Sequence, residues 1–386
     1  VLVRRSQLAK KILHVVGARP NYMKIGPVMS ALDELRTSGQ CRADIVQRLV
    51  HTGQHYDYSM STLFFEQLGM PRPDVNLEVG SGPQGQQTGR IMELFEKVLV
   101  DESPDLVVVV GDVNSTMACA IDAKKHGVEV AHIEAGLRSR DLTMPEEINR
   151  IVTDSISDLL FTTERGAGDN LLSEGRPDTS IFFVGNVMID TLMKNRATAM
   201  ALPTLDNLGL KTPEGGRREY AVLTLHRPAN VDSREALASL GEALNAIGHH
   251  MPVVFPVHPR TRARIQEFGL NDVFSAKHGL MFIEPMGYLD FLNVMANARV
   301  VLTDSGGIQE ETTILGVACL TLRPNTERPI TVTQGTSQLV GNESEAILAG
   351  FENIVSGRFQ ITARIPELWD GNAAKRIANI LAERFS

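Results

Sequence analysis

Short runs of valine, isoleucine and leucine alternate with helix-length amphipathic stretches along most of the chain. Several of these runs are apolar on both faces, as expected for strands of a parallel sheet that helices cover on each side. In the first half the pattern predicts strands at Ile12–Val16, Ile45–His51, Leu106–Val110, Val128–Ile133, Leu159–Thr162 and Ile181–Val184. The predicted helices between them are Met23–Leu35, Ser59–Leu68, Thr88–Val100, Ser115–Lys125, Glu146–Ser157 and Gly166–Leu172. This βαβ repetition indicates a doubly wound α/β fold.

The alternation pauses at Ala201–Arg218, which holds two prolines, three glycines and little apolar periodicity, and then resumes. The second series of predicted strands is Ala221–Leu225, Val253–Val257, Met281–Ile283, Val300–Thr303 and Ala318–Thr321. The predicted helices are Arg234–Ile247, Thr261–Phe268, Tyr288–Ala296, Gln309–Leu315 and, at the end of the chain, Asn372–Arg384. Because 386 residues exceed the size at which one core keeps growing, we expect two similar halves, each with its own sheet, and a ligand cleft between them.

Charge and cysteine content exclude several classes of function. The net charge is −8 and no sustained basic run occurs, so nucleic acid is not an expected partner, although a small anion remains possible. Cys41, Cys119 and Cys319 are too far apart for a disulfide framework or a CxxC metal site, which fits a reducing cytoplasm. The longest apolar runs have strand length, so no membrane span is expected, and Val1–Lys11 lacks the apolar core of a signal peptide.

Two polar segments of the first half follow predicted strands directly. Arg19 and Lys24 lie at a strand-to-helix turn, where helix amides favour an anion, but the turn is neither GxGxxG nor a P-loop and does not indicate NAD or ATP. A solvated turn with incidental basic residues explains them equally well. Asp112 follows the four-valine strand, where its carboxylate would face the cleft or cap the next helix.

A third segment, His132–Arg138, places His132 and Glu134 on a closing strand, and Pro145–Arg150 follows closely. Glu146 is a natural first-turn residue of a helix that begins after a proline, which is a sufficient structural explanation for a glutamate there. That explanation does not extend to Glu134. Acidic residues gathered around one cleft are what general acid–base chemistry needs, because burial separates their pKa values.

The second half carries polar residues after three of its predicted strands and in a Thr-Glu-Arg-Pro segment. One of these strands leads through a small-residue turn into a helix, where exposed amides and a serine hydroxyl can bind phosphate and a glutamate can reach ribose hydroxyls. The candidate ligand residues of this half are His226, His258, Ser305, Gly306, Gly307, Glu311 and Arg328. No HExxH, HxH or CxxC spacing occurs, so no metal is expected, and the absence of GxSxG leaves a serine nucleophile unsupported.

The motifs HIEAGLRS, PEEINR, TDSGGIQEE and TERP, in this order, resemble the non-hydrolysing UDP-N-acetylglucosamine 2-epimerase family from Gly17 to about Leu381. The resemblance implies two Rossmann-like domains of the glycosyltransferase-B type: residues 1–185 with the C-terminal helix 372–386, and a UDP-binding domain of residues 186–371. It implies reversible epimerisation of UDP-N-acetylglucosamine to UDP-N-acetylmannosamine, through UDP elimination, a 2-acetamidoglucal intermediate and UDP re-addition. It also implies no NAD or other cofactor, and a cytoplasmic homodimer that serves cell-surface polysaccharide synthesis.

The resemblance assigns roles to the candidate residues. Asp112, Glu134 and Glu146 would be the carboxylates of the proton-transfer steps, and His226 would be a further catalytic residue near the diphosphate and leaving group. The residues that would hold UDP are Arg19, Lys24, His258, Ser305, Gly306, Gly307, Glu311 and Arg328. Which carboxylate serves which face of the sugar stays open.

The chain departs from the commonest family pattern at a few positions. GARPNYMK lacks the glutamate that many members have after the proline, and HRPAN has Ala229 in place of a carboxylate. Gln86 stands where members activated by a second sugar nucleotide carry arginine, although Gln54 and Gln87 are retained. The activator site and the exact sugar therefore stay open. The rival interpretations are an epimerase of a related UDP-2-acetamido sugar, a UDP-sugar-dependent glycosyltransferase, a hydrolysing epimerase and a catalytically silent sensor.

Overall fold

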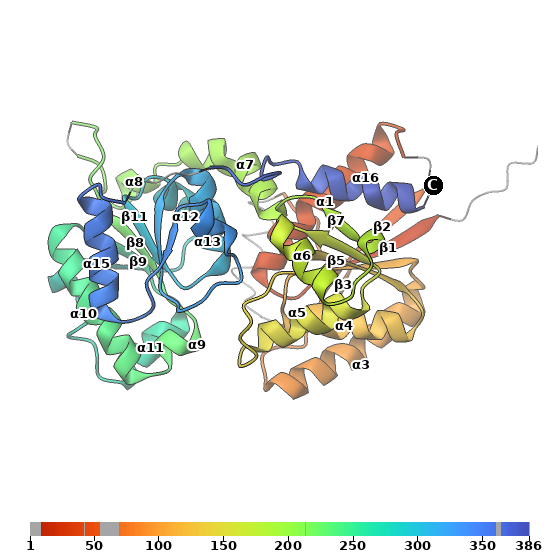
Figure 1. Cartoon of the computed structure of the whole chain (residues 1–386), viewed down its shortest axis with the longest axis horizontal. Helices are drawn as coiled ribbons and strands as arrows, with labels where there is room; N and C mark the ends of the chain where they lie inside the picture. Colours follow the sequence, from red (N-terminus) through yellow and green to blue (C-terminus); the bar gives the residue numbers. More distant parts are fainter. Residues whose placement is uncertain (1–8, 42, 55–68, 213, 360–363, 386) are drawn as a thin grey trace, which may run out of the picture. The chain divides into compact units, whose positions relative to one another are not determined.

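The computed structural model describes residues 9–41, 43–54, 69–212, 214–359 and 364–385. The chain divides into two compact units, unit 1 comprising Val1–Thr191 with Glu367–Ser386, and unit 2 comprising Leu192–Pro366. Each unit is a parallel β-sheet with helices packed on it (Figure 1). The division falls inside helix α7 (Val187–Met200), so the proline- and glycine-containing stretch Ala201–Arg218 lies within unit 2. Among the helices of the described ranges, none is both long and apolar enough to cross a bilayer.

Unit 1 has a seven-stranded sheet in the order β3-β2-β1-β4-β5-β6-β7. Its strands are β1 (Lys10–Val16), β2 (Ile45–His51), β3 (Val75–Asn76), β4 (Leu106–Val110), β5 (Glu129–Ala135), β6 (Leu159–Thr162) and β7 (Ile181–Phe183). Its helices include α1 (Arg19–Thr37), α3 (Gln84–Glu102), α4 (Asn114–Lys125), α5 (Pro145–Ile156), α6 (Arg165–Ser173) and α16 (Ala373–Arg384). The apolar runs predicted as strands are confirmed, whereas the two-residue β3 had no such run. The predicted helix Ser59–Leu68 lies outside the described residues.

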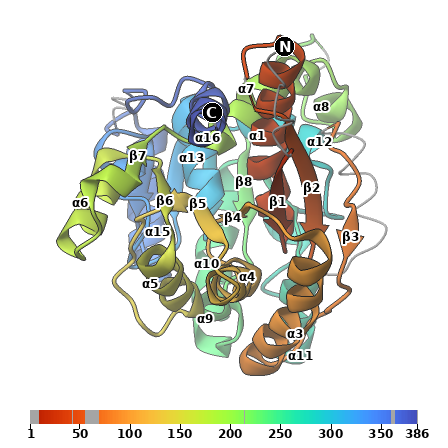
Figure 2. The same cartoon turned by 90° about the vertical axis from the view of Figure 1, so that its right-hand side faces the viewer.

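The C-terminal segment belongs to unit 1, where α16 packs on α1 (Figures 1 and 2). Trp369 is buried, and its indole N–H donates to the backbone carbonyl of Thr163 at 2.9 Å. Asp190 accepts from the backbone N–H groups of Ala373 and Ala374, at 3.2 and 2.8 Å, and so caps the amino end of α16. A buried aromatic anchor and a capped helix end together fix the last helix of the chain on the first sheet.

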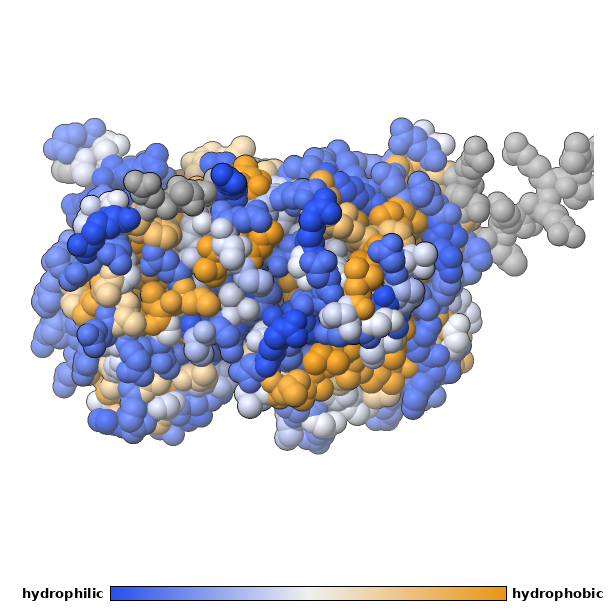
Figure 3. All heavy atoms as spheres, in the orientation of Figure 1, coloured by the Kyte–Doolittle hydropathy of each residue, from blue (hydrophilic) through white to orange (hydrophobic). Residues whose placement is uncertain are grey.

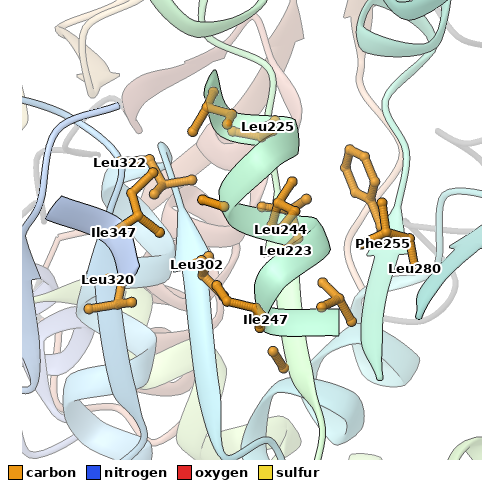
Figure 4. Packing of buried hydrophobic residues seen from close by; sticks show 14 of the residues in the cluster. Leu223, Leu225, Leu244, Ile247, Phe255, Leu280, Leu302, Leu320, Leu322 and Ile347 are labelled. Carbon is orange, nitrogen blue, oxygen red and sulfur yellow. The ribbon is translucent and has the colours of Figure 1, made fainter. Parts of the chain in front are cut away.

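Unit 2 has a six-stranded sheet in the order β10-β9-β8-β11-β12-β13. Its strands are β8 (Ala221–Thr224), β9 (Val253–Pro256), β10 (Leu280–Ile283), β11 (Val300–Thr303), β12 (Ala318–Thr321) and β13 (Ser337–Leu339). Its helices include α8 (Thr204–Asn207), α9 (Pro228–Val231), α10 (Arg234–His250), α11 (Pro259–Glu267), α12 (Tyr288–Ala296), α13 (Gly306–Leu315), α14 (Ile330–Thr333) and α15 (Ser344–Val355). Leucines of β8, β11 and β12 pack against α10 and α15 to form its core (Figure 4).

Both sheets reverse their strand order at one point, between β1 and β4 in unit 1 and between β8 and β11 in unit 2. At such a switch point the chain leaves the carboxyl ends of the two adjacent strands in opposite directions, which opens a crevice where α/β sheets bind ligands. In unit 2 the hydroxyl groups of Thr224 and Thr303, at the ends of the two strands, are 2.6 Å apart. Among the candidate residues, Lys24 and Asp112 follow the two switch-point strands of unit 1, and His226 and Ser305 follow those of unit 2.

Apolar side chains also reach the surface of unit 1. Figure 3 shows an apolar area over α4 and α5. On α5, Ile148 is 48% exposed, and Leu142 in the preceding loop is 67% exposed. These exposures are high for side chains of this size, and a partner surface would remove them from water.

Candidate active site

The switch point of unit 1 is held together by the buried side chain of Asn21. Its Oδ1 accepts from the backbone N–H groups of Gly17 and Ala18 at 3.1 and 2.9 Å, and its Nδ2 donates to the carbonyl of Val110 at 3.0 Å. The turn after β1 is thereby tied to the end of β4. Arg19 is the first residue of α1, and its side chain lies outside the described part of the structure.

Glu134 has an unusual backbone. Its φ is +74°, and the register of β5 against β6 shifts between Ile133 and Ala135, as in a β-bulge. A non-glycine residue in this left-handed region costs about 1–3 kcal/mol and persists where its surroundings hold it. The bulge directs the carboxylate to Lys24 of α1, with which it forms an ion pair. Lys24, expected as a UDP ligand, therefore contacts one of the expected acid–base residues within unit 1.

Asp112 pairs with Arg150, the last residue of the PEEINR motif, for which the sequence predicted no role. Arg150 of α5 is buried and forms ion pairs with Asp112 and, at 2.6 Å, with Glu147. The carboxylate of Glu147 also accepts from the backbone N–H groups of Ser139 and Arg140, at 2.9 and 2.8 Å. Burial raises the pKa of Glu147, but these donors and Arg150 lower it by more than burial raises it, so the net shift is downward. The Asp112 side chain stays 29% exposed and open to a ligand.

Glu146 is half-buried in the first turn of α5, as the Pro145 signal predicted. Three residues later the amide of Asn149 donates to the backbone carbonyl of Asp112 at 2.9 Å. Glu146 takes no part in the Lys24–Glu134 and Arg150–Asp112 ion pairs of the described residues. The ends of β4 and β5 and the start of α5 thus bring the three candidate carboxylates into one region of unit 1, together with Glu147, Lys24 and Arg150.

The switch point of unit 2 is organised by Asp304, which is fully buried after β11. Its carboxylate accepts from the backbone N–H groups of His226 and Arg227, at 3.0 and 2.9 Å, and from the amide of Asn230 at 3.2 Å. It also lies 2.8 Å from Nδ1 of His226. Burial raises the pKa of Asp304, but His226 and the backbone donors lower it more, so the carboxylate is ionised and Nδ1 carries a proton. The half-exposed imidazole is oriented with its Nε2 as the remaining ring nitrogen for a ligand.

Helix α13 begins as the glycine-containing motif predicted. Ser305 is its N-cap residue but forms no side-chain capping bond, so the first amides of the helix remain available to an anion. A Cβ atom on Gly306 would lie 2.5 Å from Oε1 of Glu327, so a larger residue would require that carboxylate to shift. Nε of Arg328 is 2.9 Å from Oε1 of Glu310, and both side chains are buried. Arg328 is therefore beside the α13 amino end, but one edge of its guanidinium is already engaged.

The remaining candidates of unit 2 are Glu311, which lies within α13, and His258, which precedes α11. The hydroxyl of Tyr288 donates to Oε1 of Glu311 at 2.9 Å inside the fold. His258 is exposed at the start of α11, where its Nδ1 accepts from the backbone N–H of Arg260 at 3.2 Å. The His258 and His226 ring centroids are 6.4 Å apart. In the described ranges, no three His, Cys, Asp or Glu side chains are grouped as metal ligands would be.

Comparison with known proteins gives consistent matches over nearly the whole chain. The family model for UDP-N-acetylglucosamine 2-epimerase matches residues 39–382. A UDP-N-acetylglucosamine 2-epimerase of Methanococcus maripaludis is 41% identical over 373 residues, covering 96% of this chain and 98% of the relative. A UDP-2,3-diacetamido-2,3-dideoxy-D-glucuronate 2-epimerase of Pseudomonas aeruginosa is 42% identical over 378 residues, covering 97% and 99%. The crystal structure of Methanocaldococcus jannaschii UDP-GlcNAc 2-epimerase in complex with UDP-GlcNAc and UDP is 40% identical, with a TM-score of 0.88 and coverage of 97% and 99%.

Proposed function

Because this chain belongs to the UDP-N-acetylglucosamine 2-epimerase family, we propose that it interconverts UDP-N-acetylglucosamine and UDP-N-acetylmannosamine. The observation that carries the proposal is the gathering of Asp112, Glu134 and Glu146 around the ends of β4 and β5 in a chain of this family. Inverting a carbon that bears an unactivated proton requires acid–base groups on both faces of the sugar, and these residues come from three different elements.

The proposed reaction has two halves that mirror one another. The C1–O bond breaks and UDP leaves with the bonding electrons, while a carboxylate takes the C2 proton, so that a C1–C2 double bond remains in a 2-acetamidoglucal. A proton is then delivered to the opposite face of C2, and a phosphate oxygen of UDP forms the bond to C1 again. Atoms and electrons balance without an oxidant or reductant, because the proton lost in the first half is regained in the second.

In the proposed reaction, residues of unit 1 transfer protons and residues of unit 2 bind phosphate. Lys24 and Arg150 supply counter-charges to Glu134 and Asp112, which we assign with Glu146 to proton transfer in unit 1. In unit 2, the free amides at the start of α13 and the Ser305 hydroxyl suit a phosphate, because negative charge grows on UDP as it leaves. The other UDP ligands in the proposal are Arg19, His226, His258, Gly306, Gly307, Glu311 and Arg328.

Proton NMR in deuterated buffer tests the reaction directly. With UDP-N-acetylglucosamine as the only substrate, we expect UDP-N-acetylmannosamine to appear and deuterium to enter C2 of both epimers. Release of free N-acetylmannosamine would identify a hydrolysing enzyme. Absence of any change at C1 and C2 until an acceptor sugar is added would identify a glycosyltransferase and contradict the proposal.

Three substitutions test the acid–base assignment. We expect Asp112→Asn, Glu134→Gln and Glu146→Gln each to lower turnover by ~10²-fold or more while UDP binding is kept. Glu93→Gln is a matched control, because Glu93 forms an exposed pair with Arg90 at 2.7 Å on α3. Near-normal turnover in two of the three site variants would refute the assignment.

A second candidate substrate is a UDP sugar with further acetamido or carboxylate groups. The P. aeruginosa relative named for UDP-2,3-diacetamido-2,3-dideoxy-D-glucuronate is as similar in sequence as the N-acetylglucosamine relatives. The ratio of kcat/KM for the two substrates decides between them.

We propose in addition a cytoplasmic homodimer. The buried, unpaired Cys119 and Cys319 fit that compartment, and the exposed Ile148 fits a subunit contact that sedimentation can measure.

A further inference from the structure

A buried aspartate–histidine pair connects the backbones that carry two of the candidate carboxylates. Oδ1 of Asp154, on α5, is 2.7 Å from Nδ1 of His132, on β5, and Nε2 of His132 is 2.8 Å from the carbonyl oxygen of Gly111. Oδ2 of Asp154 accepts from the backbone N–H of Gly136 at 3.0 Å. The pair therefore links the residue before Asp112 with the residue two positions after Glu134.

The hydrogen bonds of His132 fix the orientation of its ring. A carbonyl oxygen only accepts, so Nε2 of His132 carries a proton toward Gly111. Burial raises the pKa of Asp154, but His132 and Arg138, whose Nη1 is 2.7 Å from Oδ2, lower it by more than burial raises it, so the net shift is downward. Arg138 in turn pairs with Glu174, so the contacts of Asp154 continue as a row of paired side chains.

The two backbone segments that His132 and Asp154 contact adopt conformations that need support. Gly111, Glu134 and Gly136 all have positive φ, at +70°, +74° and +80°. Glycines have several accessible conformations, and Glu134 is strained, so neither strand end would hold a single geometry by local preference alone. The hydrogen bonds of His132 and Asp154 reach both ends from the closely packed interior.

We propose that Asp154 and His132 are positioning residues for the epimerisation, holding Asp112 and Glu134 in the arrangement that proton transfer at C2 requires. The inference rests on the proposed function. An ion pair that only stabilises unit 1 would make a different prediction, since its loss would lower the melting temperature without a specific effect on turnover.

Asp154→Asn separates these roles, because asparagine keeps the size and an acceptor for Gly136 but removes the charge that His132 faces. A misplacement of reacting groups by about 1 Å costs roughly 10²-fold in rate. We therefore expect kcat for UDP-N-acetylglucosamine to fall by ~10²-fold, with KM and the Kd for UDP unchanged. Turnover equal to that of the wild type would overturn the proposal.

Asp158→Asn is the matched control. Asp158 also accepts from the backbone of β5, from Val130 at 2.8 Å, and also pairs with a cation, Lys124, at 2.8 Å, but it does so at the opposite end of the strand. We expect its kcat to equal that of the wild type. If Asp158→Asn loses as much turnover as Asp154→Asn, general loosening of β5 explains both and the positioning role is wrong.

NMR of the full-length protein labelled with ¹⁵N-histidine tests the contact with Gly111 without any substrate. We expect Nε2 of His132, identified by its absence from His132→Gln, to give the shift of a protonated nitrogen, as its hydrogen bond to the carbonyl of Gly111 requires. An unprotonated Nε2 would overturn the proposal even if Asp154→Asn fails to fold. A protonated Nε2 in a wild-type protein that does not epimerise would instead place the failure in the proposed function.

Discussion

Lys24 of α1 and Glu134 of β5 form an ion pair in which both side chains are buried, with exposed fractions of 8% and 5%. The family resemblance implied that Lys24 would hold UDP, whereas its place after a strand-to-helix turn left that role open. The pairing gives the lysine a different role, as the counter-charge that a buried glutamate needs. The two roles make different predictions for one substitution.

We expect Lys24→Gln to lower kcat by ~10²-fold while the Kd for UDP stays unchanged, because a buried carboxylate without its counter-ion is displaced or neutralised. Calorimetry with UDP and initial rates with UDP-N-acetylglucosamine provide the two readouts. Lys124→Gln is the control, since Lys124 also pairs with an aspartate, Asp158, but away from the site. A large loss of UDP affinity in Lys24→Gln would restore the phosphate-binding role.

The contact of Asp304 with Nδ1 of His226 predicts that the aspartate acts through the histidine. Asp304→Asn keeps the shape but allows either tautomer of the imidazole, so we expect turnover to fall by ~10²-fold or more. His226→Gln should have a similar effect, and the double variant should be no worse than the more damaging single variant. Asp232→Asn, a surface carboxylate of unit 2 paired with Arg264 at 3.1 Å, should retain activity.

For UDP binding, we expect Arg328→Ala to raise the Kd more than Ser305→Ala does. A charge-assisted hydrogen bond contributes about 1.5–3 kcal/mol, whereas a neutral one contributes about 1 kcal/mol. Because Arg328 also pairs with Glu310, thermal unfolding must be measured beside the calorimetry. Equal affinity for UDP in wild type and Arg328→Ala would show that this arginine serves only the fold.

Asp190 predicts a pH dependence of stability. Burial raises its pKa to about 6, an effect that the N–H groups of Ala373 and Ala374 offset only in part. The native state thus holds this proton more tightly than the unfolded state, so its stabilising effect is complete below about pH 4 and is lost as the pH rises to about 6. The loss is of the order of 3 kcal/mol. We expect the melting temperature of Asp190→Asn, relative to wild type, to increase between pH 4 and pH 7, and a difference that does not change with pH would contradict the assignment.

For the rate law, we expect hyperbolic dependence on UDP-N-acetylglucosamine and a reverse reaction that needs no added activator. Ala229 and Gln86 lack the charges that activated relatives are expected to use. Gln54 and Gln87, although retained, are buried and already bonded within unit 1, Gln54 to Ser115 at 2.7 Å and Gln87 to Asn114 at 2.9 Å. Initial rates in both directions test this. Sigmoidal kinetics, or a reverse reaction silent until UDP-N-acetylglucosamine is added, would show that other residues form an activator site.

The long apolar runs allowed the central strands to be predicted, because burial on both faces imposes a simple pattern. Edge strands do not obey it. Val75–Asn76 and Ser337–Leu339 are short and partly polar, and their pairing with β2 and β12 fixes them in the sheets. Helix α15 (Ser344–Val355) was not among the predicted helices, because no recognisable motif accompanies it.

The candidate site residues could be found because they follow strands, but their partners could not. Arg150 and Asp112 are 38 positions apart, and Asp304 and the His226 amide are 78 apart, so only the sheet order brings them together. The bulge at Glu134 had no sequence signal either, because glutamate is not a residue that favours a positive φ. Hydrophobic periodicity shows which residues are buried. It does not show which buried charged residues pair with one another, and the ion pairs and the bulge depend on that pairing.

The left-handed backbone at Glu134 also bears on how such a chain can evolve. Selection for heat resistance alone would favour glycine at this position, because glycine adopts that conformation without strain. Under the acid–base role that we propose for Glu134, selection for turnover would keep the glutamate, since no residue combines a free backbone with a carboxylate. A lineage that moves to a hotter habitat would therefore have to accumulate its stabilising changes elsewhere in the fold, and position 134 should be among the last to vary.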